Sequence, residues 1–143
     1  MSLFSIQLLS GVPVYKQVVY SARKAIVSGQ LAPEAPFPSV RELSKSLKIN
    51  PNTAQKVVTA LINEGLLQVR PGIGTFVSNN VPDLERKRET LLNRQIEELV
   101  VDAKQLAIPL QQVITALSKS WEELEPKTNE TQSLTKEGQD EQS

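Results

Sequence analysis

The sequence contains no cysteine and no histidine among its 143 residues, and only 4% of the residues are aromatic. The chain can therefore form no disulfide, has no thiol nucleophile and lacks the side chains that most often bind transition metals. Acid–base chemistry near neutral pH would depend on carboxylates or lysines with shifted pKa values, and the carboxylates are scattered along the chain. These absences argue against an enzyme and predict a protein with no metal and no other cofactor.

Long apolar runs are also absent. No run approaches the ~20 residues that a membrane-spanning helix needs, and residues 1–11 place no basic side chain ahead of their apolar ones. We therefore expect a cytoplasmic protein with no membrane partner. The apolar fraction of 39% and the charged fraction of 22% are typical of a globular chain. A chain of this length buries roughly two-thirds of its surface on folding.

Charge is distributed unevenly, although the net charge is zero. Residues 1–80 hold eight basic and three acidic side chains, which gives a net charge of +5, so residues 81–143 carry −5. A basic half joined to an acidic half is expected of a protein that binds a polyanion through one half, although many ordinary surfaces carry an excess of this size.

A first helix is expected to begin at Pro13, because proline is tolerated in the first helical turn, and to end at Gly29. Its apolar residues repeat every four positions along one face, at Val14, Val18, Ala22 and Ile26. The preceding residues 1–12 are expected to form a loose arm or a short strand. Three prolines in residues 31–38 disfavour helix there and predict a stiff connector.

Two helices joined by a tight turn are predicted over residues 39–65. Ser39 and Glu42 have the spacing of a capping box, in which the serine hydroxyl accepts a hydrogen bond from a first-turn N–H group. A short helix is therefore expected over residues 40–47. The apolar side chains that should face inward on it are Val40, Leu43 and Leu47.

A longer helix of about fourteen residues is expected to begin at Pro51, after the capping residue Asn50, and to end near Gly65. Its apolar stripe consists of Ala54, Val57, Val58, Leu61 and Ile62. The opposite face holds Asn52, Lys56, Thr59 and Asn63, with Gln55 at its margin. Such a face is either plainly solvated or suited to hydrogen bonding with base edges. The helix-turn-helix layout favours the second interpretation.

Two short β-prone runs, residues 66–70 and 75–77, flank a Pro/Gly turn and predict a hairpin. A hairpin directly after a helix-turn-helix is the wing of a winged helix, whose tip can lie along phosphates or in a minor groove. Arg70 stands beside the turn, and Gly72 and Gly74 let the backbone come close to a ligand. The turn is not a nucleotide-binding loop, because no third glycine and no Lys-Ser or Lys-Thr pair follows.

With these features, residues 13–77 resemble the DNA-binding domain of the GntR family of bacterial transcription regulators. The matching residues are Pro13, Tyr15, Gln17, Gly29, Leu31, Pro33, Pro38, Ser39, Arg41, Leu43, Leu47, Thr53, Leu61, Glu64, Gly65, Leu66, Gly72, Gly74, Thr75, Phe76 and Val77. Residues 50–56 are similar to the YtrA subgroup in particular. The resemblance implies a mainly α winged helix-turn-helix with a small β-hairpin, followed by a two-helix C-terminal dimerisation segment. It also implies a sequence-specific, homodimeric DNA-binding regulator, most simply a repressor.

The sequence departs from the family pattern at three positions. Pro51 and Gln55 stand where most of the family has arginine, and Glu34 stands where a glycine is usual. Two contacts made by arginine elsewhere in the family therefore do not carry over. The resemblance does support Arg41 as a backbone or base contact, Thr53 as a phosphate or base contact at the N-terminus of the third helix, and the tip at residues 72–75 as the wing contact. The free N–H groups of a helix N-terminus attract phosphate, and arginine is a bidentate donor to guanine or phosphate.

The expected DNA-contacting residues lie on both helices of the unit and on the wing. They are Ser39, Arg41, Lys45, Asn52, Thr53, Gln55, Lys56, Thr59, Arg70, Gly72, Gly74 and Thr75. Sequence-independent affinity, through the release of counterions, would come from Lys16, Lys45, Lys56 and Arg70. Base edges would be read by Arg41, Asn52, Gln55 and Lys56. The expected partner is a double-stranded DNA operator.

Residues 81–124, which follow a winged helix placed at residues 13–80, are expected to form two amphipathic helices separated at Pro109. The apolar stripe of the first is Leu84, Leu91, Leu92, Ile96, Leu99, Val100, Ala103 and Leu106. That of the second is Leu110, Val113, Ile114, Leu117, Trp121 and Leu124. Residues 125–143 contain a single aliphatic side chain, Leu134, and are expected to be a disordered tail.

Two such helices bury too little surface to fold alone, so they need the winged helix or a second copy of the chain as a partner. We expect a homodimer, because a two-fold dimer matches a two-fold related operator, and because YtrA-like regulators carry a short helical pair in this place. The expected interface residues are Leu92, Ile96, Leu99, Leu110, Val113, Ile114, Leu117 and Trp121. The two C-terminal helices are too small to enclose a ligand pocket of ~300 Å³ by themselves. A ligand could bind between the winged helix and the C-terminal helices or at the dimer seam, and the sequence identifies no effector.

A winged helix can instead bind protein without specific DNA binding, and the acidic C-terminal half would then be its docking surface. The charge of the exposed face of the third helix discriminates between the two hypotheses. Lys56, with amides and threonine around it, favours DNA, whereas glutamate at such positions would favour a protein partner.

Overall fold

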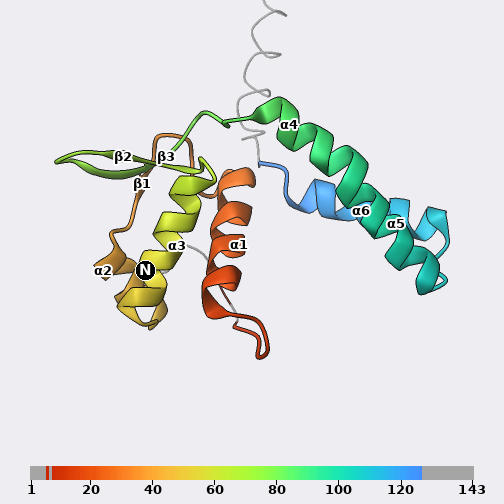
Figure 1. The fold of residues 1–143 in the computed structure, drawn as a ribbon, viewed down its shortest axis with the longest axis horizontal. Helices are drawn as coiled ribbons and strands as arrows, with labels where there is room; N and C mark the ends of the chain where they lie inside the picture. The colour runs from red at the N-terminus through yellow and green to blue at the C-terminus, as the bar shows by residue number, and fades with distance from the viewer. Residues whose placement is uncertain (1–5, 7, 127–143) are drawn as a thin grey trace, which may run out of the picture.

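The computed structural model describes residue 6 and residues 8–126 (Figure 1). Its elements, in chain order, are α1 (Val14–Val27), β1 (Pro36–Phe37), α2 (Val40–Leu47), α3 (Pro51–Asn63), β2 (Leu67–Arg70), β3 (Gly74–Val77), α4 (Leu84–Glu89), the π-helical segment η1 (Thr90–Gln95), α5 (Ile96–Gln105) and α6 (Leu110–Glu123). The first three helices and the sheet form the winged helix-turn-helix that the sequence predicts. The remaining helices extend away from it (Figure 1).

The hydrophobic core lies where α1, α2 and α3 meet the sheet. Its largest fully buried side chains are Leu43, Leu61, Val18, Val57 and Val77. The apolar stripe predicted for α3 is confirmed, since four of its five members are buried and Ile62 is half-buried.

On α1 the buried face is Val18, Val19, Ala22 and Ala25, so the predicted four-residue repeat is only partly right. Val14 is exposed and Ile26 is half-buried. The reason is geometric: a step of four residues overshoots one helical turn by about 40°, so a strict four-residue repeat drifts off the face.

The sheet has three antiparallel strands in the order β1-β3-β2, one more than the predicted hairpin. The β2–β3 hairpin is confirmed, with Leu67 opposite Val77 and Arg70 opposite Gly74. The expectation that residues 31–38 are only a stiff connector is wrong. Within them β1 pairs Phe37 with Thr75 on the open edge of β3. An edge strand tolerates proline, and the burial of the Phe37 ring anchors this one.

The predicted caps of the helix-turn-helix are confirmed. The Ser39 hydroxyl accepts a hydrogen bond from the Glu42 N–H group at 3.2 Å. The Asn50 carboxamide accepts one from the Asn52 N–H group at 2.8 Å. In the turn between the helices, the Ser44 hydroxyl donates to the Ile49 carbonyl oxygen at 2.6 Å. These local bonds set the start of each helix and hold the turn between them.

Gln17 on α1 ties down the segment before the helix. Its amide nitrogen donates to the carbonyl oxygens of Leu9 and Val12, both at 2.9 Å, and its amide oxygen accepts from the Leu9 N–H group at 2.7 Å. The described part of the predicted arm, residues 6 and 8–12, forms no strand. The rest of the arm lies outside the described residues, as do residues 127–143 of the predicted tail.

The C-terminal helices run out and back (Figure 1). α4, η1 and α5 form one continuous helix, as predicted, although its middle turns are π-helical. The chain then reverses through Ala107, whose φ is +56°, and α6 begins after Pro109. Among the described residues of these C-terminal helices, only Ala103 is buried. None of the helices that the structure describes is both apolar enough and long enough to cross a bilayer.

Candidate nucleic-acid interface

The polar face of α3 is open to solvent. Asn52, Gln55, Lys56 and Thr59 are exposed, and Thr53 is half-buried in the first turn. The C-terminal helices lie on the other side of α1 and do not cover this face (Figure 1). The first-turn N–H groups give this end of α3 a partial positive charge, which suits a phosphate.

Gln55 is held in place by its own helix. Its amide nitrogen donates a hydrogen bond to the Thr59 hydroxyl at 3.2 Å, one turn further along. A carboxamide has two N–H donors and an acceptor oxygen, so one donor and the oxygen remain. That pair is the one with which glutamine reads the major-groove edge of adenine.

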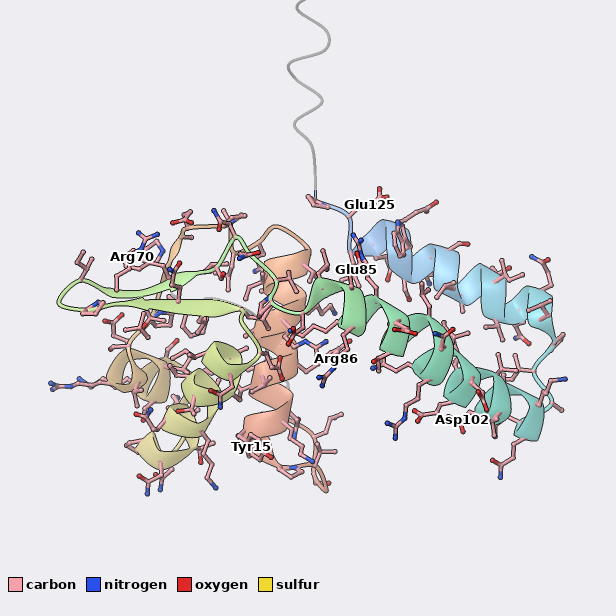
Figure 2. The ribbon with its side chains drawn as sticks, turned by 45° about the horizontal axis from the view of Figure 1, so that its top comes forward. Tyr15, Arg70, Glu85, Arg86, Asp102 and Glu125 are labelled. Carbon is pink, nitrogen blue, oxygen red and sulfur yellow. The ribbon has the colours of Figure 1, made fainter. Side chains whose placement is uncertain are left out.

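Lys56 leans toward α1. Its Nζ atom lies 5.9 Å from the centroid of the Tyr15 ring, within the range of a cation–π contact. Tyr15 stands near the start of α1, at the end of the winged helix where α3 begins (Figure 2). The two residues, together with Gln55, Thr59, Ala60 and Asn63, line a shallow open hollow of about 380 Å³.

Sequence reasoning did not include Tyr15 in the candidate site. Tyr15 was identified only as a residue that matches the family, and nothing local to residues 13–17 reveals that Lys56 lies beside it. The contact depends on the packing of α1 against α3, which brings together residues far apart in the sequence.

The candidate residues at the start of α2 and along it have different roles. The Ser39 side chain is occupied with capping, because its hydroxyl also lies 3.3 Å from a Glu42 carboxylate oxygen. Arg41 and Lys45 are exposed, and no described residue forms an ion pair with either. These two cations are therefore available to an anionic partner.

The wing tip is exposed and built on glycine. Gly72 has φ +77°, and a side chain added there would meet open space. Gly74, the first residue of β3, has φ +148°. Between them Ile73 projects into solvent, and its N–H group donates to the Arg70 carbonyl oxygen at 3.0 Å. Thr75, the remaining candidate on the wing, is half-buried.

Arg70, expected to be available to phosphate, already has two partners. Its guanidinium group forms an ion pair with the Glu34 carboxylate and lies 4.3 Å from the centroid of the Phe76 ring. Figure 2 shows Arg70 on the side of the sheet that faces away from α2 and α3. The structure therefore brings together Arg70 and Glu34, a pairing that the sequence did not predict.

The expected interface residues of the C-terminal helices remain uncovered. Leu92, Ile96 and Leu99 are exposed on η1 and α5. On α6 only Val113 is half-buried, and the exposed members are Leu110, Ile114, Leu117 and Trp121. Trp121 is 70% exposed. An apolar surface of this kind usually marks an interaction site.

An open apolar groove of about 560 Å³ lies between the end of α1 and the end of α6. It is lined by Val27, Leu117, Ser120, Trp121, Leu124, Glu125 and Pro126. It falls between the winged helix and the C-terminal helices, one of the two places where the sequence left room for a ligand.

Comparison with known proteins places these features in a family. Residues 14–77 match the family model described as "Bacterial regulatory proteins, gntR family". Over 105 residues the chain is 30% identical to the HTH-type transcriptional repressor YtrA of Bacillus subtilis strain 168. That alignment covers 73% of this chain and 81% of the relative.

Two solved structures match a larger share of the chain than the family model does. A Listeria monocytogenes EGD-e protein described as a transcriptional antiterminator superposes with a TM-score of 0.73 at 24% identity, over 85% of this chain and 91% of that one. This likeness bears on the fold alone. YtrA from Sulfolobus acidocaldarius, described as a GntR-family transcription factor, has a TM-score of 0.50 at 27% identity. It covers 83% of this chain and 97% of that one.

Proposed function

The chain belongs to the GntR family of bacterial regulatory proteins and is a DNA-binding transcription regulator rather than an enzyme, and from this premise we propose that it is a homodimeric repressor. In this proposal α3 enters the major groove of each half of a two-fold related operator, and the wing lies along the adjacent backbone or minor groove. Repression follows from occupation of the operator. A DNA-bound regulator of this kind acts in the cytoplasm.

The observation that carries the proposal is the exposure of the polar face of α3 beside the wing. This face presents amides, a hydroxyl and one lysine, and no described part of the chain covers it. Short polar side chains of this kind can exchange hydrogen bonds with base edges, whereas a face of glutamates would repel DNA. The surface therefore fits DNA better than it fits a protein partner.

Roles follow from position. Gln55 and Asn52 read bases, because they stand on the exposed face of the first two turns of α3. Arg41 binds bases or phosphate at the start of α2, and Thr53 binds phosphate at the N-terminus of α3. The remaining candidate positions contribute sequence-independent contacts to the DNA backbone: Lys45, Lys56, Thr59, Arg70, Gly72, Gly74 and Thr75. Tyr15, beside Lys56, joins this set. Ser39, whose hydroxyl caps α2, instead supports the site by fixing the start of that helix.

The dimer is supported by the apolar surface of the C-terminal helices. A monomer would leave Leu92, Ile96, Leu99 and Trp121 in water, although burying an aliphatic or aromatic side chain of this size stabilises by roughly 1.5 to 3 kcal/mol. A second copy offers the same surface under two-fold symmetry. The resulting pair of α3 helices can then address two half-sites.

The test is a titration of the protein against duplex DNA from upstream of its own gene, at two salt concentrations, with a scrambled duplex of equal length as control. We expect tighter binding to the upstream DNA by at least a factor of about 10³. The affinity should fall as salt rises, because bound phosphates release counterions. Equal affinity for the two duplexes would contradict specific binding and favour a protein-binding module.

A further inference from the structure

Three side chains from different parts of the chain meet on the outer face of the wing. Arg70 ends β2, Phe76 stands on β3, and Glu34 precedes β1. The Arg70 guanidinium group lies over the Phe76 ring, 4.3 Å from its centroid, and forms an ion pair with the Glu34 carboxylate. The sheet therefore holds an acid beside the one basic side chain of the wing, residues 66–78.

The backbone explains why the three meet. Arg70 is opposite Gly74, which has no side chain, so the Arg70 side chain is free to lie over the diagonal neighbour Phe76. On the other edge of β3, the Glu34 N–H group donates to the Val77 carbonyl oxygen at 2.9 Å. Glu34 has φ +68°, a left-handed conformation that is costly for a residue with a side chain. Its position is thus set by the sheet rather than by a local preference.

The ion pair is accessible to an exchanging partner. The side chain of Arg70 is 39% exposed and that of Glu34 is 45% exposed. A pair at this exposure is worth little in water, so another anion can displace the carboxylate at small cost. The Phe76 ring would still support the guanidinium group after such an exchange, because the cation–π contact uses the face of the group and leaves its N–H donors free.

We propose that Glu34 competes with DNA phosphate for Arg70 and thereby weakens the sequence-independent part of DNA binding by the wing. This inference rests on the proposed function. In the free protein the carboxylate neutralises Arg70. On DNA the guanidinium group exchanges the carboxylate for a phosphate oxygen, while Glu34 remains nearby and repels the backbone. Discrimination between operator and random DNA then depends more strongly on the base contacts of α3, which Glu34 does not affect.

The test compares Glu34→Gln with Glu64→Gln in the full chain. The two substitutions remove the same charge, both carboxylates are 45% exposed, and each lies near an arginine, since the Arg23 Nε atom is 3.8 Å from Glu64. Glu64 follows α3, about 20 Å along the helix axis from its DNA-facing N-terminus. A general effect of net charge would therefore appear in both variants, and an effect of the wing only in Glu34→Gln.

Binding is measured by titration against the upstream and the scrambled duplex over a series of salt concentrations. We expect Glu34→Gln to bind both duplexes about two- to fivefold more tightly at low salt, the change that an exposed ion pair supports. The slope of log affinity against log salt should steepen by up to about 0.9, the value for one phosphate contact. Glu64→Gln should leave affinity and slope close to those of the unsubstituted chain.

A double substitution tests whether the effect of Glu34 acts through Arg70. In an Arg70→Gln background, Glu34→Gln should have no more effect than Glu64→Gln, because the competition acts through Arg70. The inference would be overturned if Glu34→Gln still changed DNA affinity in the absence of Arg70, or if the two glutamate variants changed affinity equally. Weaker DNA binding by Glu34→Gln would overturn it as well. Weaker binding would mean that Glu34 positions Arg70 for DNA. Specific binding by the unsubstituted chain separates these outcomes from failure of the proposed function, in which the upstream duplex is not preferred at all.

Discussion

The Nζ atom of Lys87, in α4, donates a 3.1 Å hydrogen bond to the backbone carbonyl oxygen of Glu64, where α3 ends. A positive charge at this end of a helix is favourable, because the last carbonyl groups carry partial negative charge. The Glu64 side chain also approaches Arg23 of α1. The end of α3 is therefore tied both to the rest of the winged helix and to the first of the C-terminal helices.

Replacing Lys87 with methionine removes this cap while keeping a long side chain of similar helix propensity. We expect the free energy of unfolding to fall by about 0.3 to 1 kcal/mol, measured by urea denaturation. The control is Arg88→Met, because Arg88 contacts only the exposed Glu85 among the ion pairs of the described residues, and pairs of that kind contribute little. Equal losses in the two variants would show that the contact to Glu64 does not stabilise the fold.

Gly65 and Gly72 have nearly the same φ angle but different surroundings, so alanine substitutions at the two positions isolate the cost of a steric clash. Their φ angles are +78° and +77°, so alanine at either position incurs the same left-handed cost of roughly 1 to 2 kcal/mol. A Cβ at Gly65 would also lie 2.3 Å from the Cδ atom of Pro82, whereas one at Gly72 meets nothing within 4 Å. The rigid pyrrolidine ring of Pro82 cannot relieve this clash by changing rotamer, as the end of a flexible side chain can.

We therefore expect Gly65→Ala to destabilise the protein by about 1 to 3 kcal/mol more than Gly72→Ala does, as overpacking usually does. Chemical denaturation of the two variants measures the difference. If both lose the same free energy, the segment containing Pro82 moves away without cost and does not hold the end of α3.

Replacing Gln55 with alanine should remove a base contact. We expect a loss of about 1 to 3 kcal/mol in binding to the upstream duplex and little change on the scrambled one. Gln112→Ala, an exposed position on α6, is the matched control and should change neither. Fluorescence anisotropy with a labelled duplex measures both affinities. Similar losses on both duplexes would remove Gln55 from the residues that read bases.

A charge placed in the proposed dimer interface should separate the protomers. Leu99 and Val101 are exposed to similar extents, 41% and 57%, but they point to opposite sides of α5, because two residues advance about 200° around a helix. Leu99→Glu should give a monomer in sedimentation at concentrations where the unsubstituted chain is a dimer. Val101, which stands among Arg94, Glu97 and Asp102, should tolerate glutamate.

A chain ending at Asn80 tests the same interface by removal. It retains every element of the winged helix and should sediment as a monomer. If the shortened chain still forms a dimer, the interface lies elsewhere. The same conclusion follows if Val101→Glu dissociates the dimer and Leu99→Glu does not.

Predictions from sequence succeeded where the controlling interactions are local. Ser39 and Asn50 cap helices through bonds to residues two or three positions away, so the boundaries of α2 and α3 could be located from short patterns. The exposure of Gln55 and Thr59 followed in the same way from helical periodicity. By contrast, β1 was missed because its partners Thr75 and Phe76 are about forty residues further along the chain.

The sequence by itself determined the succession of helices and hairpin and the polar face that α3 presents, because caps, turns and periodic burial depend on near neighbours. Only the tertiary structure decided which charges meet. Glu34 and Arg70 are 36 residues apart in the sequence. Lys56 on α3 contacts the ring of Tyr15 on α1. Such contacts depend on how helices and strands pack, which no short pattern encodes, and they determine which of the predicted cations are available to DNA.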